Sequence, residues 1–292
     1  YVELPSGPIF NLIDIYLLKV ISKKNKPIHV FYRDAYWLLA EDFFSKDIKN
    51  LVKIKLTEIL QKRDLRVYNK TISMLYMPTE TCIKEFSKYY KFKNMKPLPP
   101  GTDNNHHFEY KITHTGIYVG GSTKPYGVDI LIKAYEILNK DIDTYKLIIV
   151  TRNGELQNEE ELNNTYDWII IVHKSGKKEL EPLYRKADCA FLPQRKSLYL
   201  DMSFGIKMFE YIGYGLPIIV NDLFEMKRFV EDNGIGISYN KTAESLAESI
   251  KSFYSDGKQH DIRKNIIRTC NENLWVSRVD TIVSDFEYEI QK

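Results

Sequence analysis

The sequence has few cysteines, no strong charge imbalance and no long apolar run, and each absence excludes a class of protein. Its three cysteines lie far apart without C-x-x-C spacing, which argues against a disulfide framework and favours a reduced, cytoplasmic setting. No apolar run reaches the length of a transmembrane helix. Lys and Arg number 42 against 39 Asp and Glu, and a net charge of +3 is too small to indicate a nucleic-acid partner.

The sequence also lacks internal repeats and a recognisable metal-binding pattern. His106 and His107 have no partners at the spacing typical of zinc ligands, so we expect no metal cofactor. The numbering begins at Tyr1, without Met and without a signal-like segment. We therefore expect further residues upstream.

Alternating strands and helices dominate the second half of the chain. Apolar strands are predicted at 116–119, 146–151, 168–172, 189–193, 217–220 and 234–238. Helical patterns separate them, and strands spaced by helices predict parallel pairing with right-handed crossovers. A complete α/β doubly wound domain is expected at about 112–273.

The first half of the chain predicts a smaller α/β region. Three strands are expected at 28–32, 72–77 and 95–98, with helices at 47–63 and 80–90. The run PPGTDNNHH at 99–107 is typical of a connector between domains. A length of 292 residues suits two domains, which we assign to 1–108 and 109–275, followed by an amphipathic segment at 276–292.

The segment 191–220 carries the clearest functional signal. It predicts a strand end, a polar loop, a helix that begins after Gly205, a Gly turn and a second strand. In a parallel sheet such a helix N-terminus faces the edge where phosphorylated ligands bind. Lys207 lies in the first turn, where the helix dipole disfavours a cation unless an anion is present, and Glu210 shares its face. The pair suits a diphosphate beside a ribose. An exposed ion pair without function is the alternative.

The run SFGIKMFEYIGYGLPIIV at 203–220 resembles the nucleotide-sugar signature of the family-4 retaining glycosyltransferases, which have the GT-B architecture. The resemblance implies a fold of two Rossmann-like doubly wound domains. Three strands are too few for a GT-B amino-terminal domain, so 1–108 is expected to be incomplete. The segment 276–292 is expected to be a closing helix that packs back on the first domain.

The resemblance also implies roles for the residues around this helix. Glu210 corresponds to the carboxylate that holds the donor ribose, and Lys207 would neutralise the diphosphate. The second acidic residue of many members corresponds to Met202, so the two-carboxylate pattern is incomplete, and Asp201 is a neighbouring substitute. The donor-binding residues expected in this segment are Asp201, Ser203, Phe204, Gly205, Ile206, Lys207 and Glu210.

Two other strand ends are expected to contribute to the donor site. Gly120 and Gly121 would let a phosphate approach backbone amides, although a tight turn alone also explains them. The cations of the family pattern are absent at Gly121 and at 126–127, and Lys124 and Lys207 are the available replacements. His173 follows a strand at the place where relatives contact the donor base, or it is only a polar strand end.

The segment Tyr32–Trp37 resembles the Arg-Asp-x-Trp segment of bacterial polysaccharide glycosyltransferases. It implies an acceptor side formed by Arg33, Asp34, Tyr36 and Trp37, with Asp34 near the reacting sugar as a catalytic candidate beside Lys207 and Glu210. A structural Arg-Asp pair with two core aromatics is the alternative.

The resulting expectation is metal-independent, retaining transfer of a sugar from a nucleotide-diphosphate-sugar to a carbohydrate, lipid-linked or protein acceptor, in glycan or polysaccharide synthesis. Association with a partner subunit or with the inner face of the membrane is compatible with it. A non-catalytic GT-B subunit that binds a partner glycosyltransferase or carbohydrate is the alternative. A Rossmann oxidoreductase is disfavoured, because Gly120 and Gly121 lack the full G-x-G-x-x-G and no acidic residue ends the next strand.

Overall fold

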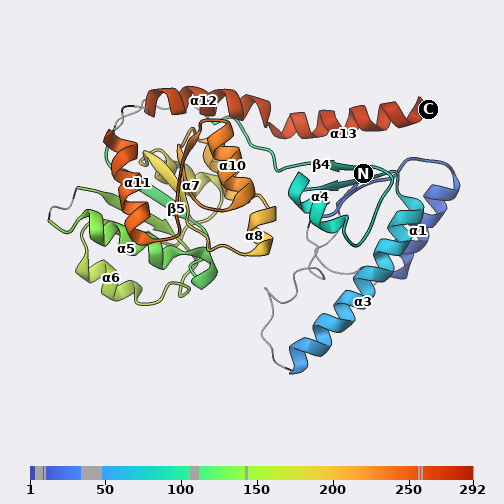
Figure 1. Ribbon diagram of the computed structural model, residues 1–292, viewed down its shortest axis with the longest axis horizontal. Coiled ribbons are helices and arrows are strands. Elements are labelled where there is room, and N and C mark those ends of the chain that lie inside the picture. The colour runs from blue at the N-terminus through green and yellow to red at the C-terminus, as the bar shows by residue number, and fades with distance from the viewer. Residues whose placement is uncertain are drawn as a thin grey trace. The chain divides into compact units, whose positions relative to one another are not determined.

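The computed structural model describes residues 1–3, 9, 11–33, 48–105, 112–141, 144–255, 257 and 259–291 (Figure 1). The chain divides into two compact units. The first combines Tyr1–Pro100, Ser197–Phe204 and Val276–Lys292, and the second combines Gly101–Lys196 and Gly205–Trp275. Ser197–Phe204, which the sequence analysis placed in the domain 109–275, joins the first unit, where the Thr79 hydroxyl donates to the carbonyl of Met202.

The second unit is built on a parallel six-stranded sheet in the order β10-β9-β8-β5-β6-β7. The predicted alternation of strands and helices is confirmed there. Nearly every residue of the central strands is buried, as expected for a parallel sheet covered on both faces. Its strands are β5 (Thr115–Val119), β6 (Lys146–Val150), β7 (Ile169–Val172), β8 (Cys189–Leu192), β9 (Ile218–Asn221) and β10 (Gly236–Tyr239).

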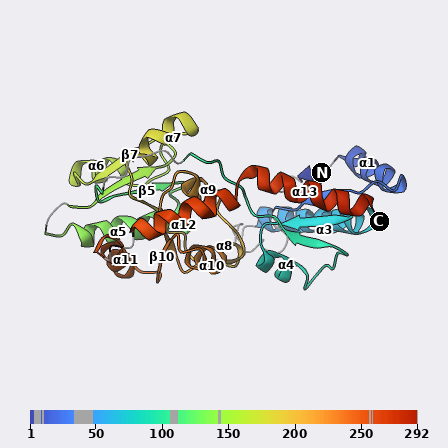
Figure 2. The same cartoon turned by 90° about the horizontal axis from the view of Figure 1, so that it is seen from above.

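Helices cover both faces of this sheet. Figure 2 shows α5 and α11 together on one face and α7 on the opposite face. The helical elements are η2 (Lys124–Tyr126), α5 (Val128–Leu138), α6 (Glu159–Thr165), α7 (Lys177–Tyr184), α9 (Ile206–Gly213), α10 (Phe224–Asp232), α11 (Ala243–Ser255) and α12 (Gln259–Glu272). Helices α6 and α12 were not predicted from the sequence.

The strand order places a topological switch point between β5 and β8, which are neighbours although three connections separate them in the chain. The two strands pair only at Gly116 with Cys189 and at Ile117 with Ala190. Beyond Ile117 they separate, and ligands of doubly wound folds bind at the carboxyl ends of strands at such a point.

The first unit contains a parallel four-stranded sheet in the order β1-β2-β3-β4. The sequence predicted three strands; the additional strand, β1, has two residues and no apolar run that could identify it. The strands are β1 (Val2–Glu3), β2 (His29–Phe31), β3 (Met74–Met77) and β4 (Met95–Pro97). The helices are α1 (Leu12–Lys23), α3 (Ile48–Thr71), α4 (Glu80–Phe86), α8 (Leu198–Met202) and α13 (Trp275–Ile290).

The two-residue period of the strands divides the first unit into two layers. Val30 and Leu75 face a core that also includes Leu65 of α3. His29 and Tyr76 face the opposite side, where the Tyr76 hydroxyl donates to Asp285 of α13 at 2.8 Å and the His29 ring stacks on Phe286 at 3.6 Å. Helix α13 therefore covers the face of the sheet that α3 leaves open.

No helix in the described part of the chain is both long enough and apolar enough to cross a membrane.

Candidate functional site

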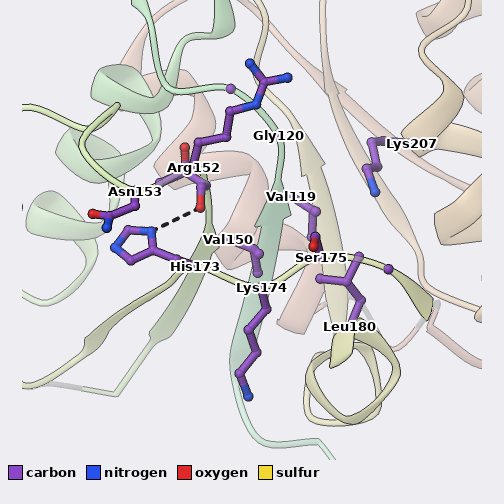
Figure 3. Close-up of a pocket in the computed structure, with 13 residues that line it drawn as sticks. Val119, Gly120, Val150, Arg152, Asn153, His173, Lys174, Ser175, Leu180 and Lys207 are labelled. Atoms are coloured by element: carbon purple, nitrogen blue, oxygen red, sulfur yellow. Dashed lines mark hydrogen bonds between the residues drawn. The ribbon is translucent and has the colours of Figure 1, made fainter. Parts of the chain in front are cut away.

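A pocket of about 430 Å³ opens at the carboxyl edge of the second sheet (Figure 3). The ends of β5, β6 and β7 and the starts of α7 and α9 form it. Figure 3 shows His173 and Asn153 on one side and Lys207 on the other, with Val119 and Val150 between them. The lining residues are Val119, Gly120, Gly121, Val150, Thr151, Arg152, Asn153, His173, Lys174, Ser175, Gly176, Leu180 and Lys207.

The pocket is basic. Arg152, Lys174 and Lys207 line it, and none of its described lining residues is acidic. Cations that converge on a cleft concentrate anionic ligands there. The pocket therefore combines the position and the charge expected for a phosphorylated ligand.

Helix α9 presents Lys207 to this pocket from its first turn. The helix begins at Ile206, after Gly205 in an extended conformation, and its first turn contains no acidic residue. The side chains of Met208, Phe209, Tyr211 and Ile212 are buried and fix one face of the helix in the core. Lys207 and Glu210 consequently lie together on the opposite face.

Two contacts set the position of α9. Where β5 separates from β8, the N–H of Val119 donates to the hydroxyl of Tyr211 at 3.0 Å. At the other end of the helix, a Cβ on Gly213 would overlap the hydroxyl of Thr102. The helix is thus tied to β5, the strand that Gly120 and Gly121 follow.

Glu210 has a charged and a neutral partner. The ammonium of Lys207 lies 2.5 Å from one carboxylate oxygen, and the hydroxyl of Tyr184 donates to the other at 2.8 Å. The side chains of Lys207 and Glu210 are 34% and 26% exposed. The predicted pairing of the two residues on one helix face is confirmed. Burial, with the adjacent Tyr211 and Glu210, raises the pKa of Tyr184 far above its usual value, so this hydroxyl remains a donor.

The Gly120–Gly121 turn leaves no room for side chains. A Cβ on Gly121 would lie 2.6 Å from the ring of Tyr126, and a Cβ on Gly120 would lie 2.6 Å from the hydroxyl of Tyr118. Packing therefore accounts for both glycines, and both line the pocket. Lys124 lies instead in a second pocket, of about 490 Å³, with Asp129 and Glu155.

His173 ties the ends of two strands together. Its Nδ1 lies 3.1 Å from the carbonyl oxygen of Thr151, and its Nε2 lies 2.9 Å from the carboxylate of Glu159. The Thr151 carbonyl, followed by Glu159, raises the pKa of His173. The imidazolium form donates to both acceptors and holds the end of β7 against the end of β6.

Glu210 contacts the lining residue Lys207 but does not itself line the pocket, and the remaining predicted donor residues do not line it either. Asp201 belongs to α8, and Ser203 and Phe204 follow it in the first unit, while Gly205 precedes α9 and Ile206 is its first residue. Met202, at the position of the missing second carboxylate, is buried with 3% exposure. These roles stay predictions.

The predicted acceptor side falls almost entirely outside the described residues. Asp34, Tyr36 and Trp37 are not described. A nitrogen of the Arg33 guanidinium lies 3.5 Å from the carboxylate of Glu3, and both side chains are about half exposed.

Several residues of the site were not predicted from the sequence. Arg152 and Asn153 follow β6 after Thr151, so their place at a strand end, like that of His173, could have identified them. Tyr184 had no local signal, because its contact with Glu210 joins two helices 26 positions apart. Within the described residues, no group of three or more His, Cys, Asp or Glu side chains could hold a metal ion.

Comparison with protein families gives one match. The family model of the glycosyl transferases group 1 matches residues 104–269, more than half of the chain. This range contains the whole pocket lining and Glu210. Among curated protein sequences, none matches this chain significantly.

Three solved structures of glycosyltransferases have a similar fold. The pneumococcal O-GlcNAc transferase GtfA, in complex with UDP and GlcNAc, has a TM-score of 0.66 at 14% identity over 95% of this chain and 60% of its own. The GtfA/B complex has a TM-score of 0.68 at 13% identity, and the match covers 96% of this chain and 61% of that one. WaaG, a glycosyltransferase involved in lipopolysaccharide biosynthesis, has a TM-score of 0.62 at 16% identity, and the match covers 88% of this chain and 76% of the WaaG chain. This chain spans about 60% of the GtfA chain. The likeness supports the predicted GT-B fold.

Proposed function

The chain belongs to the glycosyl transferases group 1, and on this premise we propose that it transfers a sugar from a nucleotide-diphosphate-sugar to a hydroxyl acceptor. The observation that carries the proposal is the basic pocket at the carboxyl ends of β5, β6 and β7, with Lys207 at the start of α9 and Glu210 paired to it. The resemblance of 203–220 to the family-4 enzymes supports retention of configuration. The acceptor is a carbohydrate, a lipid-linked sugar or a protein.

The charges of the site suit the departure of a nucleoside diphosphate. Negative charge develops on the diphosphate as the glycosidic bond breaks, and fixed cations stabilise it most where they are already in place. Lys207 is in such a position, near the amides at the start of α9. In this proposal Glu210 accepts hydrogen bonds from the ribose hydroxyls, and the resemblance of 32–37 offers Asp34 as a contact of the reacting sugar or the acceptor. Because the pocket supplies cationic side chains, we propose that the reaction needs no metal ion.

A donor screen tests this function. The protein is incubated with a panel of nucleotide-sugars, and release of the nucleoside diphosphate is measured with and without EDTA. We expect one donor to be consumed equally in both conditions. The variant Lys207→Ala should lower kcat/KM by about 10- to 100-fold. Lys251→Ala removes an exposed lysine of α11 outside the pocket lining and serves as the matched control. A panel without any consumed donor would contradict the proposal.

A non-catalytic subunit is the second candidate function. The buried Met202 at the place of a family carboxylate, and Tyr126 at the place of a family cation, favour it. Such a subunit would bind a partner glycosyltransferase or a carbohydrate, and in that role it would work on the cytoplasmic side with its partner or at the membrane surface. Calorimetry with nucleoside diphosphates distinguishes the two functions. Binding that Glu210→Ala weakens favours the enzyme, whereas absence of binding favours the subunit.

A further inference from the structure

Tyr184 is a buried side chain with a polar contact to the candidate site. It lies at the end of α7 with 1% exposure, and its ring packs on Tyr214 at 4.5 Å and on Tyr211 at 5.9 Å between centroids. Leu180, four residues earlier on the same helix face, lines the basic pocket. The Tyr184 hydroxyl donates to Glu210 at 2.8 Å. Helix α7 therefore lines the pocket through Leu180 and contacts the Glu210 carboxylate through Tyr184.

The two partners of Glu210 differ in mobility. Lys207 has a long, flexible side chain, is one-third exposed and also lines the pocket, so a diphosphate would compete with Glu210 for its ammonium. Tyr184 is enclosed by two tyrosine rings and has no such alternative. When an anion draws Lys207 away, the hydroxyl of Tyr184 remains to orient the carboxylate.

A ribose diol needs such an oriented carboxylate. A carboxylate has about four acceptor positions on its two oxygens. Tyr184 occupies one of them, which leaves room for both vicinal hydroxyls. Because the geometry of a bidentate contact depends on the plane of the carboxylate, a fixed donor on one oxygen favours the bound arrangement before the ligand arrives.

We propose that Tyr184 is a positioning residue that holds the carboxylate of Glu210 toward the ribose hydroxyls of the donor while Lys207 turns to the diphosphate. This inference rests on the proposed function and assigns to a core tyrosine a part in recognising ribonucleotides.

The experiment compares ribonucleotides with their 2′-deoxy counterparts. Binding of UDP, GDP and ADP, and of the corresponding 2′-deoxynucleotides, is measured by calorimetry for the wild type and for Tyr184→Phe. Phe keeps the ring packing and removes only the hydroxyl. We expect Tyr184→Phe to bind the preferred ribonucleotide about tenfold more weakly and its 2′-deoxy form with little change, so the preference for ribose falls. A purely structural tyrosine would change both affinities together.

Tyr166→Phe is the matched control, because the Tyr166 hydroxyl also donates to a glutamate, Glu136, at 2.9 Å, and lies outside the pocket lining. It should leave the ribose preference unchanged. In the Glu210→Ala background, Tyr184→Phe should have no further effect.

The outcomes separate this inference from the proposed function. A ribose preference that survives Tyr184→Phe, or a Tyr184→Phe effect that persists in Glu210→Ala, would overturn the role of Tyr184 alone. A wild-type protein that binds none of the three ribonucleotides would overturn the proposed function and this inference with it.

Discussion

At the scale of single residues, the Lys207–Glu210 ion pair compensates the unfavourable position of the Lys207 charge at the start of α9. Lys207 lies where the partial positive charge of the α9 N-terminus disfavours a cation. The carboxylate of Glu210, 2.5 Å from the Lys207 ammonium, offsets that cost. With both side chains about one-third exposed or less, the contact is worth roughly 1 kcal/mol or below. A ligand can therefore exchange the partners of Lys207 at a small free-energy cost.

This balance predicts opposite effects of Glu210→Gln on two anions. The change removes the carboxylate charge and releases Lys207, so inorganic pyrophosphate should bind about two- to fivefold more tightly. The preferred nucleoside diphosphate should bind more weakly, because the ribose loses a charged acceptor. Competition calorimetry measures both affinities. Equal weakening of both would show that Glu210 does not restrain Lys207.

His173 gives a prediction on pH. Its pKa is raised, first by the Thr151 carbonyl and then by Glu159, so the imidazolium is the form that ties the two strand ends. The stabilisation is complete below the ordinary His pKa of about 6.5, and it is lost as pH rises through the raised value in the folded protein. NMR titration of the ring should give a pKa above the ordinary one, and Glu159→Gln should lower it. The ring signal that is missing from the spectrum of His173→Gln belongs to His173. A Glu159→Gln variant with the same His173 pKa would contradict this account.

At the scale of elements, the turn before α5 depends on one glycine. Gly127 has a φ of +69°, and a Cβ there would overlap the carbonyl oxygen of Pro193, the residue that follows β8. Gly127→Ala should reduce the free energy of unfolding by about 2–4 kcal/mol, from strain in the left-handed conformation and from the clash.

Gly154→Ala is the control for this change. Gly154 has nearly the same φ, +72°, and a Cβ added there would meet no atom within 4 Å, so the variant should lose only about 1 kcal/mol. Urea denaturation measures both variants. Equal losses of unfolding free energy would show that backbone strain alone, without the contact to Pro193, accounts for the effect of Gly127→Ala.

Most elements that were predicted from the sequence have a continuous apolar signal. Strands such as β6 are buried on both faces, so their apolar runs identify them directly. Helix α6 has no buried residue, and α8 is only five residues long, so neither shows a helical apolar stripe. In α1, apolar residues occupy the exposed positions as well as the buried ones, and this hides the 3.6-residue period.

Site residues could be predicted from the sequence where strand order alone determines their position. Lys207 and His173 stand at positions that strand order alone brings to one edge. The hydrogen bond from Tyr184 to Glu210 depends on how α7 and α9 pack, which no local pattern encodes.

At the scale of the whole molecule, α13 belongs to the first unit although it follows the second in the chain. It contributes Asp285 and Phe286 to the face of the sheet that carries His29 and Tyr76, and Lys96 of β4 lies 2.9 Å from Asp285. Removing it would expose a buried histidine and a buried tyrosine to water.

Deletion of 276–292 should therefore weaken the first unit and spare nucleotide binding by the second. Hydrogen exchange should show loss of protection in β2 and β3, and calorimetry should show an unchanged affinity for the preferred nucleoside diphosphate. The point substitution Asp285→Asn tests the same contact with the helix retained. Unaltered protection of β2 and β3 in the deletion variant would contradict this prediction.

The composition of the first unit from three separate chain segments has a consequence for synthesis on the ribosome. Its sheet is translated early, yet the helix that covers one face emerges only after all of 101–275 has been made. The second unit can complete its fold while the nascent first unit still displays His29 and Tyr76. Until 276–292 has been made, that face lacks its covering helix, and transiently exposed surface of this kind favours aggregation of incompletely folded chains.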